Sequence, residues 1–153
     1  MDGMTIARIS LFLLVLLMMQ MSIYLLAPNK KWIEFPKKCR RSSNCTRVAE
    51  TNTRGYGLKP ISLKGNTTVI QEKIISIINE RTRMTILNEK KGFIHAVEIT
   101  PFFRFHDDVA IRIFESGKNV IIWLQSQSRL GLYDFNVNER RIQKLHDRIS
   151  VLK

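Results

Sequence analysis

The pattern of hydrophobic and polar positions divides the chain into an apolar segment, an irregular segment and a region with regular periods. The apolar segment runs from Ile9 to Ala27, carries no charge and is interrupted by three polar residues. As a helix it would be about 28 Å long, close to the hydrocarbon thickness of a bilayer. A cleaved signal peptide is disfavoured, because Leu25 would lie at the −3 position and Pro28 would follow the cut. We therefore expect residues 1–28 to form one transmembrane anchor.

Residues 29–64 show no sustained hydrophobic period, and prolines and glycines interrupt them repeatedly. Such a composition is typical of irregular structure. We expect a connector between the anchor and a folded domain. The only two cysteines of the chain, Cys39 and Cys45, lie in it.

The spacing of apolar residues becomes regular in residues 65–153. Four isoleucines between residues 70 and 78 recur at helical spacing, and Thr68 with Gln71 fits a capping box, so we expect a helix over about 68–82. Four runs rich in strand-forming residues then follow, at 84–89, 93–100, 109–113 and 120–124.

A second helix is predicted at the C-terminus, where Asn138 could cap it. Its apolar stripe consists of Ile142, Leu145, Ile149 and Leu152. The connections between the four runs are short, which favours an antiparallel meander. The fold class is therefore α+β: an antiparallel meander of about four strands packed by two helices, over residues 65–153, preceded by one N-terminal transmembrane helix.

The charge of the chain is strongly positive and unevenly placed. Lys and Arg number 25 against 13 Asp and Glu, a formal net charge of +12, and ten basic residues against two acidic ones lie in residues 29–64. Basic residues directly after an apolar segment favour attraction to anionic lipid head groups. A nucleic-acid partner is disfavoured, because no known motif and no basic face with interleaved aromatics is present. We expect membrane lipids to contact the anchor and the basic connector.

The side of the membrane on which the domain lies stays open. The basic residues after the apolar segment favour a cytoplasmic domain under the positive-inside rule. A disulfide between Cys39 and Cys45 would instead favour an oxidising compartment, such as the periplasm. Two free thiols in a reducing cytoplasm fit the same residues equally well.

The densest polar segment is SQSRLGLYDFNVNERR, directly after the apolar run VIIWL. Together with GFIHAVEITPFFRFHDDVAIRIF it resembles the bacterial and plastid domain-of-unknown-function family 1499. Members of that family carry an Asp-Asp pair opening a strand and a Ser-x-Ser-Arg-x-Gly-x-x-Asp-x-x-x-Asn-x-x-Arg signature. The matching residues of this chain are Asp107, Asp108, Ser126, Ser128, Arg129, Gly131, Asp134, Asn138 and Arg141.

The resemblance covers about residues 39–150, since a Cys…Ser-x-Asn-Cys segment of the family is similar to Cys39, Ser42, Asn44 and Cys45. It implies no established activity. Members of the family are often exported or attached to a membrane, which leaves the orientation about evenly balanced.

Catalysis is poorly supported by these residues. A serine nucleophile, Ser126 or Ser128, would need a histidine base, and only His106 adjoins the Asp107–Asp108 pair. Consecutive strand residues point to opposite faces of a sheet, so these three residues cannot all converge on a metal ion. We assign no catalytic residue, no metal ligand and no cofactor.

Two other interpretations of the polar residues remain. In the structural one, Asp107 and Asp108 form a turn before a strand, and Arg129 and Arg112 pair with Asp134 or Asp108. In the binding one, an anion such as a lipid phosphate or carboxylate is received near the start of the last helix, and a small pocket between sheet and helices accepts an apolar tail. The arginines of that anion site would be Arg129, Arg140 and Arg141.

The sequence thus predicts a single-pass protein of the bacterial inner membrane that acts as a non-enzymatic, envelope-associated binding or scaffold module. An anionic small ligand or an envelope protein would be its partner. The alternative is a metal- or serine-dependent hydrolase acting at the membrane surface. The candidate binding residues are Ser126, Ser128, Arg129, Asp134, Asn138, Arg141, Asp107 and Asp108.

Overall fold

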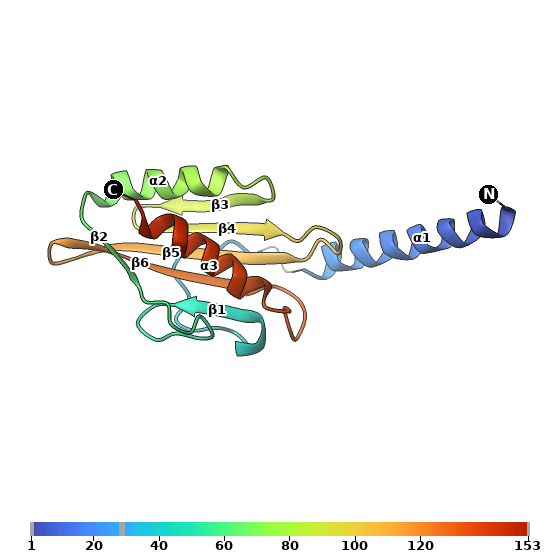
Figure 1. Ribbon diagram of the computed structural model, residues 1–153, viewed down its shortest axis with the longest axis horizontal. Coiled ribbons are helices and arrows are strands. Elements are labelled where there is room, and N and C mark those ends of the chain that lie inside the picture. The colour runs from blue at the N-terminus through green and yellow to red at the C-terminus, as the bar shows by residue number, and fades with distance from the viewer. Residues whose placement is uncertain (1, 28–29, 153) are drawn as a thin grey trace.

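A computed structural model describes residues 2–27 and 30–152 and shows a long N-terminal helix joined to an α+β domain (Figure 1). The elements, in chain order, are α1 (Gly3–Leu26), the 3-10 turn η1 (Ser42–Asn44), β1 (Cys45–Val48), β2 (Ile61–Leu63), α2 (Thr67–Asn79), β3 (Met84–Lys90), β4 (Phe93–Ile99), β5 (His106–Ser116), β6 (Asn119–Ser128) and α3 (Val137–Ser150). The predicted α+β class is confirmed.

The strands form one antiparallel sheet in the order β1-β6-β5-β4-β3, and β2 also pairs with β6. Strands β3 to β6 follow one another across the sheet, as the meander prediction requires. The sheet has six strands instead of about four, because β1 and β2 come from the segment predicted to be irregular. Each has only three or four residues, too few for a hydrophobic period to be recognised.

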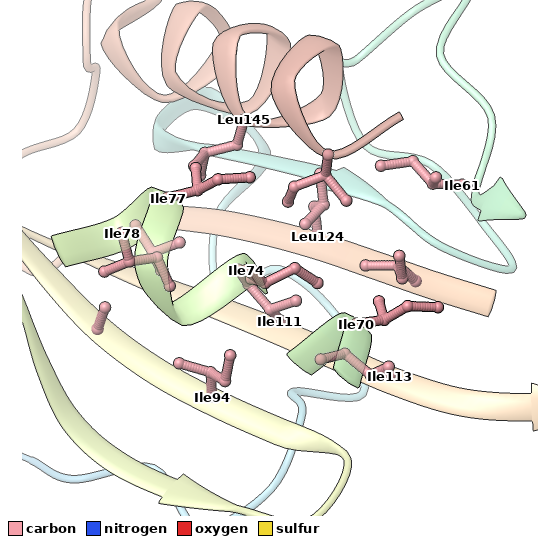
Figure 2. Close-up of a cluster of buried hydrophobic side chains, with 14 of the residues drawn as sticks. Ile61, Ile70, Ile74, Ile77, Ile78, Ile94, Ile111, Ile113, Leu124 and Leu145 are labelled. Carbon is pink, nitrogen blue, oxygen red and sulfur yellow. The ribbon is translucent and has the colours of Figure 1, made fainter. Parts of the chain in front are cut away.

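Helices α2 and α3 pack on one face of the sheet over a core that consists largely of isoleucine (Figure 2). Its centre is formed by Ile74, Ile78, Ile94, Ile111, Leu124 and Leu145, all almost completely buried. Each buried side chain of this size stabilises the fold by roughly 1.5–3 kcal/mol. The core therefore fixes both helices against the strands.

The start of α2 differs from the predicted capping box. Asn66 is the N-cap, and its side-chain oxygen accepts hydrogen bonds from the backbone N–H groups of Thr68 and Val69 at 2.8 and 3.4 Å. Gln71 turns away from the cap and joins the helix to the β3–β4 turn, donating to the carbonyl of Lys90 and accepting from Gly92 N–H. The capping box was wrong because Asn66, two positions before Thr68, is itself a strong cap.

The opposite face of the sheet is crossed by residues 30–41, here called the strap, which can be followed as a light-blue trace behind the strands (Figure 1). Trp32 stacks on the ring of His95, with ring centroids 5.0 Å apart and planes within 5°. Further along, the backbone N–H of Arg40 donates to the side-chain oxygen of Gln127 at 2.9 Å. The strap therefore covers polar and aromatic side chains that would otherwise face solvent.

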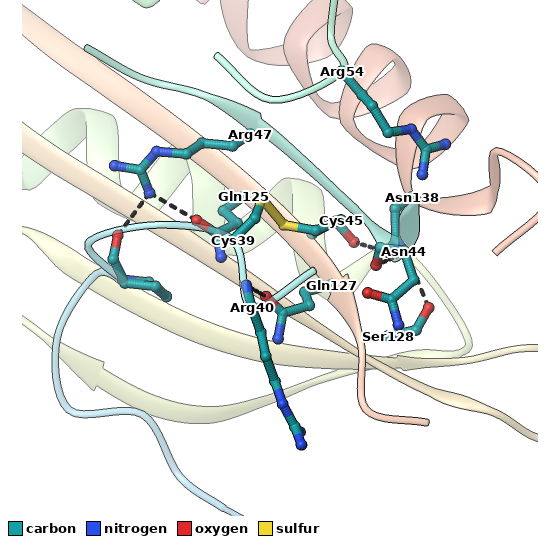
Figure 3. The surroundings of a disulfide bond; sticks show 12 residues. Cys39, Arg40, Asn44, Cys45, Arg47, Arg54, Gln125, Gln127, Ser128 and Asn138 are labelled. Carbon is teal, nitrogen blue, oxygen red and sulfur yellow. Dashed lines mark hydrogen bonds between the residues drawn. A yellow bond between two sulfur atoms is a disulfide. The ribbon is translucent and has the colours of Figure 1, made fainter. Parts of the chain in front are cut away.

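A disulfide between Cys39 and Cys45 joins the end of the strap to β1 (Figure 3). Beside it, Arg47 donates to the side chain of Gln125 at 2.7 Å and to the carbonyl of Pro36. Of the two alternatives left open for these cysteines, the structure has the bonded one.

Helix α1 is 24 residues long and is apolar enough to cross a membrane, although an N-terminal signal sequence has the same length and composition. It contacts the domain at the β4–β5 loop, where the Gln20 side chain donates to the carbonyl of Phe102 at 2.8 Å. The Tyr24 and His106 rings lie 6.4 Å apart. Pro28, the expected end of the anchor, lies outside the described residues.

Candidate functional site

The polar residues predicted as a site lie mostly within strands and are buried. Asp107 and Asp108 belong to β5, and Ser126 and Ser128 belong to β6, so none of the four is a turn residue. Alternation along each strand places Asp107, Ser126 and Ser128 towards α3 and Asp108 towards the opposite face. The predicted site is therefore divided between the two faces of the sheet.

On the helix side, Arg141 of α3 organises a buried cluster, here called the Arg141 network (Glu98, Asp107, Ser126, Ser128, Asn138 and Arg141). Its guanidinium donates to Asp107 at 2.8 Å, to Ser126 at 2.9 Å and to Asn138 at 2.7 Å. It also donates to Glu98, which pairs in addition with Arg81 at 2.8 Å. Although burial opposes ionisation of Glu98, these two guanidiniums hold the pKa of its carboxyl below the usual value.

Asn138 belongs to this network and does not cap α3. Its amide donates to the carbonyl of Asn44 at 2.9 Å and to Ser128 at 3.0 Å, and its oxygen accepts from Ser126 at 2.6 Å. The helix start is satisfied by Asp134, whose carboxylate accepts from the Asn138 backbone N–H at 2.8 Å. The predicted cap was wrong because Asn138 is the second residue of α3 and its side chain bonds to the serines of β6.

Asp134 pairs with Arg54 at 2.7 Å, not with Arg129. Burial raises the pKa of the Asp134 carboxyl, but the hydrogen bonds from Arg54 and Asn138 lower it by a larger amount. The pKa of this carboxyl therefore lies below the usual value. Arg54 thus ties the loop after β1 to the start of α3.

On the strap side, Arg129 makes a bidentate pair with Asp108 at 2.9–3.1 Å, as one interpretation of the sequence expected. Asp108 also contacts His95 Nε2 at 2.8 Å. Because the Trp32 backbone N–H donates to His95 Nδ1, the proton of a neutral His95 lies on Nε2 and is donated to Asp108. Arg112 does not pair with an aspartate; its guanidinium lies over the Trp123 ring.

Because of these contacts, few of the predicted side chains have charges or hydrogen-bonding groups left to bind a ligand. Arg129 and Arg141, two of the three arginines expected to hold an anion, are buried and paired, and only Arg140 is exposed. Ser126 donates to an asparagine instead of a histidine. Within residues 2–27 and 30–152, no three His, Cys, Asp or Glu side chains are grouped so that they could hold a metal ion.

Sequence reasoning missed Glu98, Arg54 and His95 as partners in these clusters. Glu98 and His95 are ordinary members of a strand pattern, and Arg54 lies in a segment without any period. No local signal could have identified them, because each contacts residues far away in the sequence.

An apolar pocket of about 250 Å³ lies at the α1 end of the domain, between the β4–β5 and β6–α3 loops. Its walls are largely apolar and aromatic, formed by residues that include Phe103, Phe105, Leu130, Tyr133, Phe135 and Val137. Asp107, Ser128 and Asp134 are the main polar groups in its lining. A mostly apolar cavity with a few polar groups is the usual form of a small-molecule site.

Asp107 is a buried acidic residue in the lining of the pocket. Arg141 binds its Oδ2, whereas its buried Oδ1 accepts no hydrogen bond from the described residues. Burial raises the pKa of the Asp107 carboxyl, and Arg141 and the nearby Ser128 hydroxyl offset this only in part. The Oδ1 of Asp107 is closed to solvent, so this carboxylate belongs to the Arg141 network and is not an open contact point for a ligand.

The comparison with protein families agrees with the sequence signature. The family described as protein of unknown function (DUF1499) matches residues 37–149, more than half of the chain. The chain belongs to the DUF1499 family. The DUF1499 match includes every strand of the sheet, α2 and nearly all of α3, whereas α1 and the first part of the strap lie outside it. No curated protein and no solved structure matches the chain.

Proposed function

We propose that this DUF1499 protein is a membrane-anchored, non-enzymatic binding module whose pocket takes the apolar part of a lipid-like molecule. The observation that carries the proposal is the position of the pocket. The β4–β5 loop forms one wall of the pocket and is also the loop that α1 contacts through Gln20. If α1 spans the bilayer, the pocket opens at the membrane surface.

The contact between α1 and the β4–β5 loop supports this position. Gln20 lies six residues before the end of α1, which corresponds to about 9 Å along the helix axis. The Phe102 carbonyl that accepts from it would therefore lie beside the part of the helix that enters the bilayer. This hydrogen bond satisfies two polar groups that the hydrocarbon region would leave unpaired.

Exposed aromatic and aliphatic side chains surround the pocket. Phe102 and Phe135 are 78% and 76% exposed, and Leu132, Tyr133 and Phe103 are also largely in contact with solvent. Apolar side chains gathered on two neighbouring loops are typical of a surface that contacts a membrane or a partner. Next to a helix of membrane-spanning length, the bilayer interface is the environment that suits them best.

The backbone of the same two loops is strained. Arg104 in one loop and Phe135 with Asn136 in the other have positive φ angles of 56°, 49° and 61°. Non-glycine residues rarely adopt this region, and such strain clusters at ligand sites. It supports a functional role for the two loops that form the pocket.

A photoreactive lipid tests the proposal. The full chain, reconstituted into phosphatidylcholine vesicles, is irradiated with hexadecanol that carries a diazirine in its chain, and labelled peptides are mapped by mass spectrometry. We expect labelling of Leu130 and Val137 in the pocket wall, measured relative to the labelling of α1.

Leu130→Trp, which fills the pocket, should lower the relative labelling of Val137 roughly tenfold, as expected when an occupant loses about two buried methylenes. Leu132→Trp is the matched control, because Leu132 lies on the same loop, is 71% exposed and does not line the pocket. Equal labelling in both variants, with unchanged circular dichroism, would contradict the proposal.

A further inference from the structure

A second hollow, of about 170 Å³, lies beside the apolar pocket, between the first turns of α3, the start of β3 and the end of β4. Its lining contains five basic residues (Arg81, Arg83, Arg140, Arg141 and Lys144) and one acidic residue, Glu98. The hollow is therefore strongly basic, whereas the pocket beside it is apolar.

The carboxylate of Glu98 does not neutralise the exposed cations of the hollow, because Arg81 and Arg141 already pair with it. Arg83, Arg140 and Lys144 are exposed, and the described part of the chain offers none of them an ion pair. The hollow thus has unpaired positive charge at its exposed side chains.

The hollow and the pocket form adjacent parts of one surface. Thr100 and Val137 line both of them. A molecule with its apolar part against Leu130 and Phe135 can therefore place a charged group against Arg140 and Lys144. Arginine and lysine side chains bind phosphate and carboxylate oxygens through charge-assisted hydrogen bonds.

We infer that the ligand of the pocket is an anionic amphiphile, and that its phosphate or carboxylate group binds in the basic hollow. This inference rests on the proposed function, because it assigns the charged end of the molecule whose apolar end the pocket holds. It also places the anion at Arg83, Arg140 and Lys144, whereas the buried pairs of Arg129 and Arg141 serve to hold the domain together.

The experiment compares two probes that differ only in the charged group. Diazirine-bearing hexadecyl phosphate and the corresponding hexadecanol are each applied to the full chain in phosphatidylcholine vesicles, and labelling of Leu130 and Val137 is measured relative to α1. Since each cation near a lipid phosphate contributes roughly a fivefold gain in affinity, the two cations Arg140 and Lys144 should make the phosphate probe label the pocket wall roughly 25-fold more than the alcohol.

Arg140→Glu with Lys144→Glu should remove the preference for the phosphate probe and leave labelling by hexadecanol unchanged. Lys64→Glu with Lys118→Glu is the matched control: it changes the net charge equally, at exposed positions after β2 and in the β5–β6 turn. This control should retain the preference. An equal loss in both double variants would show an effect of bulk charge and overturn the inference.

The remaining outcomes separate the two proposals. If both probes label the pocket wall equally in the unmodified chain, the inference is wrong and the proposed function stands. If neither probe labels the wall, both are wrong. Inorganic phosphate added at the concentration of the phosphate probe should leave the labelling by that probe unchanged. If it displaces the phosphate probe, the hollow binds free phosphate and the assignment to an amphiphile fails.

Discussion

Asn138 is the residue that joins α3 to both serines of β6 and to the turn before β1. Its side chain joins the carbonyl of Asn44, two serines of β6 and Arg141, and it is completely buried. Each such bond contributes about 0.5–1.5 kcal/mol, but a buried partner left unsatisfied costs about 1–3 kcal/mol. The two hydrogens that Asn138 donates are therefore as important as the oxygen that accepts.

Asn138→Asp tests this role, because it keeps the shape and the acceptor but removes both donated hydrogens. We expect the free energy of unfolding to fall by about 1–3 kcal/mol, since the Asn44 carbonyl and Ser128 Oγ lose their donor. Urea unfolding of the full chain in a non-ionic detergent, followed by circular dichroism, measures the change.

Asn136→Asp is the matched control at the N-cap of the same helix. Its oxygen accepts from Arg54 at 2.8 Å, an interaction that aspartate keeps and strengthens. We expect no loss of stability in this variant. Equal effects of the two substitutions would mean that Asn138 contributes no more than a residue at the helix start.

At the residue scale, the sequence allowed the prediction of contacts between chemically complementary neighbours. The pairing of Arg129 with Asp108 was among its alternatives, because both residues belong to the motifs of the same family. The partners of Asp134 and Arg141 could not be predicted, since Arg54 and Glu98 come from distant segments that only the fold brings near. Packing of these segments, and not local pattern, selects the pairs.

At the element scale, the strap and its disulfide are the part of the domain that the hydrophobic pattern did not reveal. The long periodic elements α2, α3 and β3 to β6 were predictable, because their apolar stripes must face one core. The strap has no such stripe. It is held by single contacts, such as the Trp32–His95 stacking, and by the link from Cys39 to Cys45.

Cys39→Ser with Cys45→Ser should lower the free energy of unfolding by about 2 kcal/mol, because the open loop gains entropy mainly in the unfolded chain. The strap should also loosen, since its bond to β1 is lost. In a Trp123→Phe background, Trp32 is the only tryptophan, and its fluorescence should change as it leaves the His95 ring.

The helix and strand signals in circular dichroism should persist in this variant, because the isoleucine core lies on the other face of the sheet. The unmodified chain after treatment with a thiol reductant serves as the control and should behave in the same way. Unchanged stability and unchanged Trp32 fluorescence would mean that the strap is held without the disulfide.

At the scale of the whole molecule, the proposed anchor predicts that the chain stays in the membrane, and the disulfide predicts that the domain lies in an oxidising compartment. We expect the intact chain to stay in the membrane fraction after alkaline carbonate extraction, with α1 still attached in its mass spectrum. Release of a shorter chain would identify α1 as a cleaved signal sequence.

The Cys39–Cys45 bond persists in an oxidising compartment, so the domain is expected outside the cytoplasm. An alkaline phosphatase fused after Lys153, which is active only outside the cytoplasm, should therefore be active in bacteria that express the fusion. An inactive fusion would place the domain in the cytoplasm, as the basic residues after the anchor suggest. The α+β class could be predicted at this scale, whereas the contact of α1 with the pocket loop could not, because it rests on single side-chain contacts of Gln20 and Tyr24 with residues far away in the sequence.

The short connection between α1 and the strap limits where the domain can work. Trp32, the first strap residue that contacts His95, follows Leu26 by six residues, which span at most about 20 Å even when fully extended. If α1 crosses the bilayer, the domain can reach only the leaflet to which it is tethered, and it cannot carry a molecule to a second membrane. Any lipid exchange by this protein would therefore occur in cis, within one leaflet.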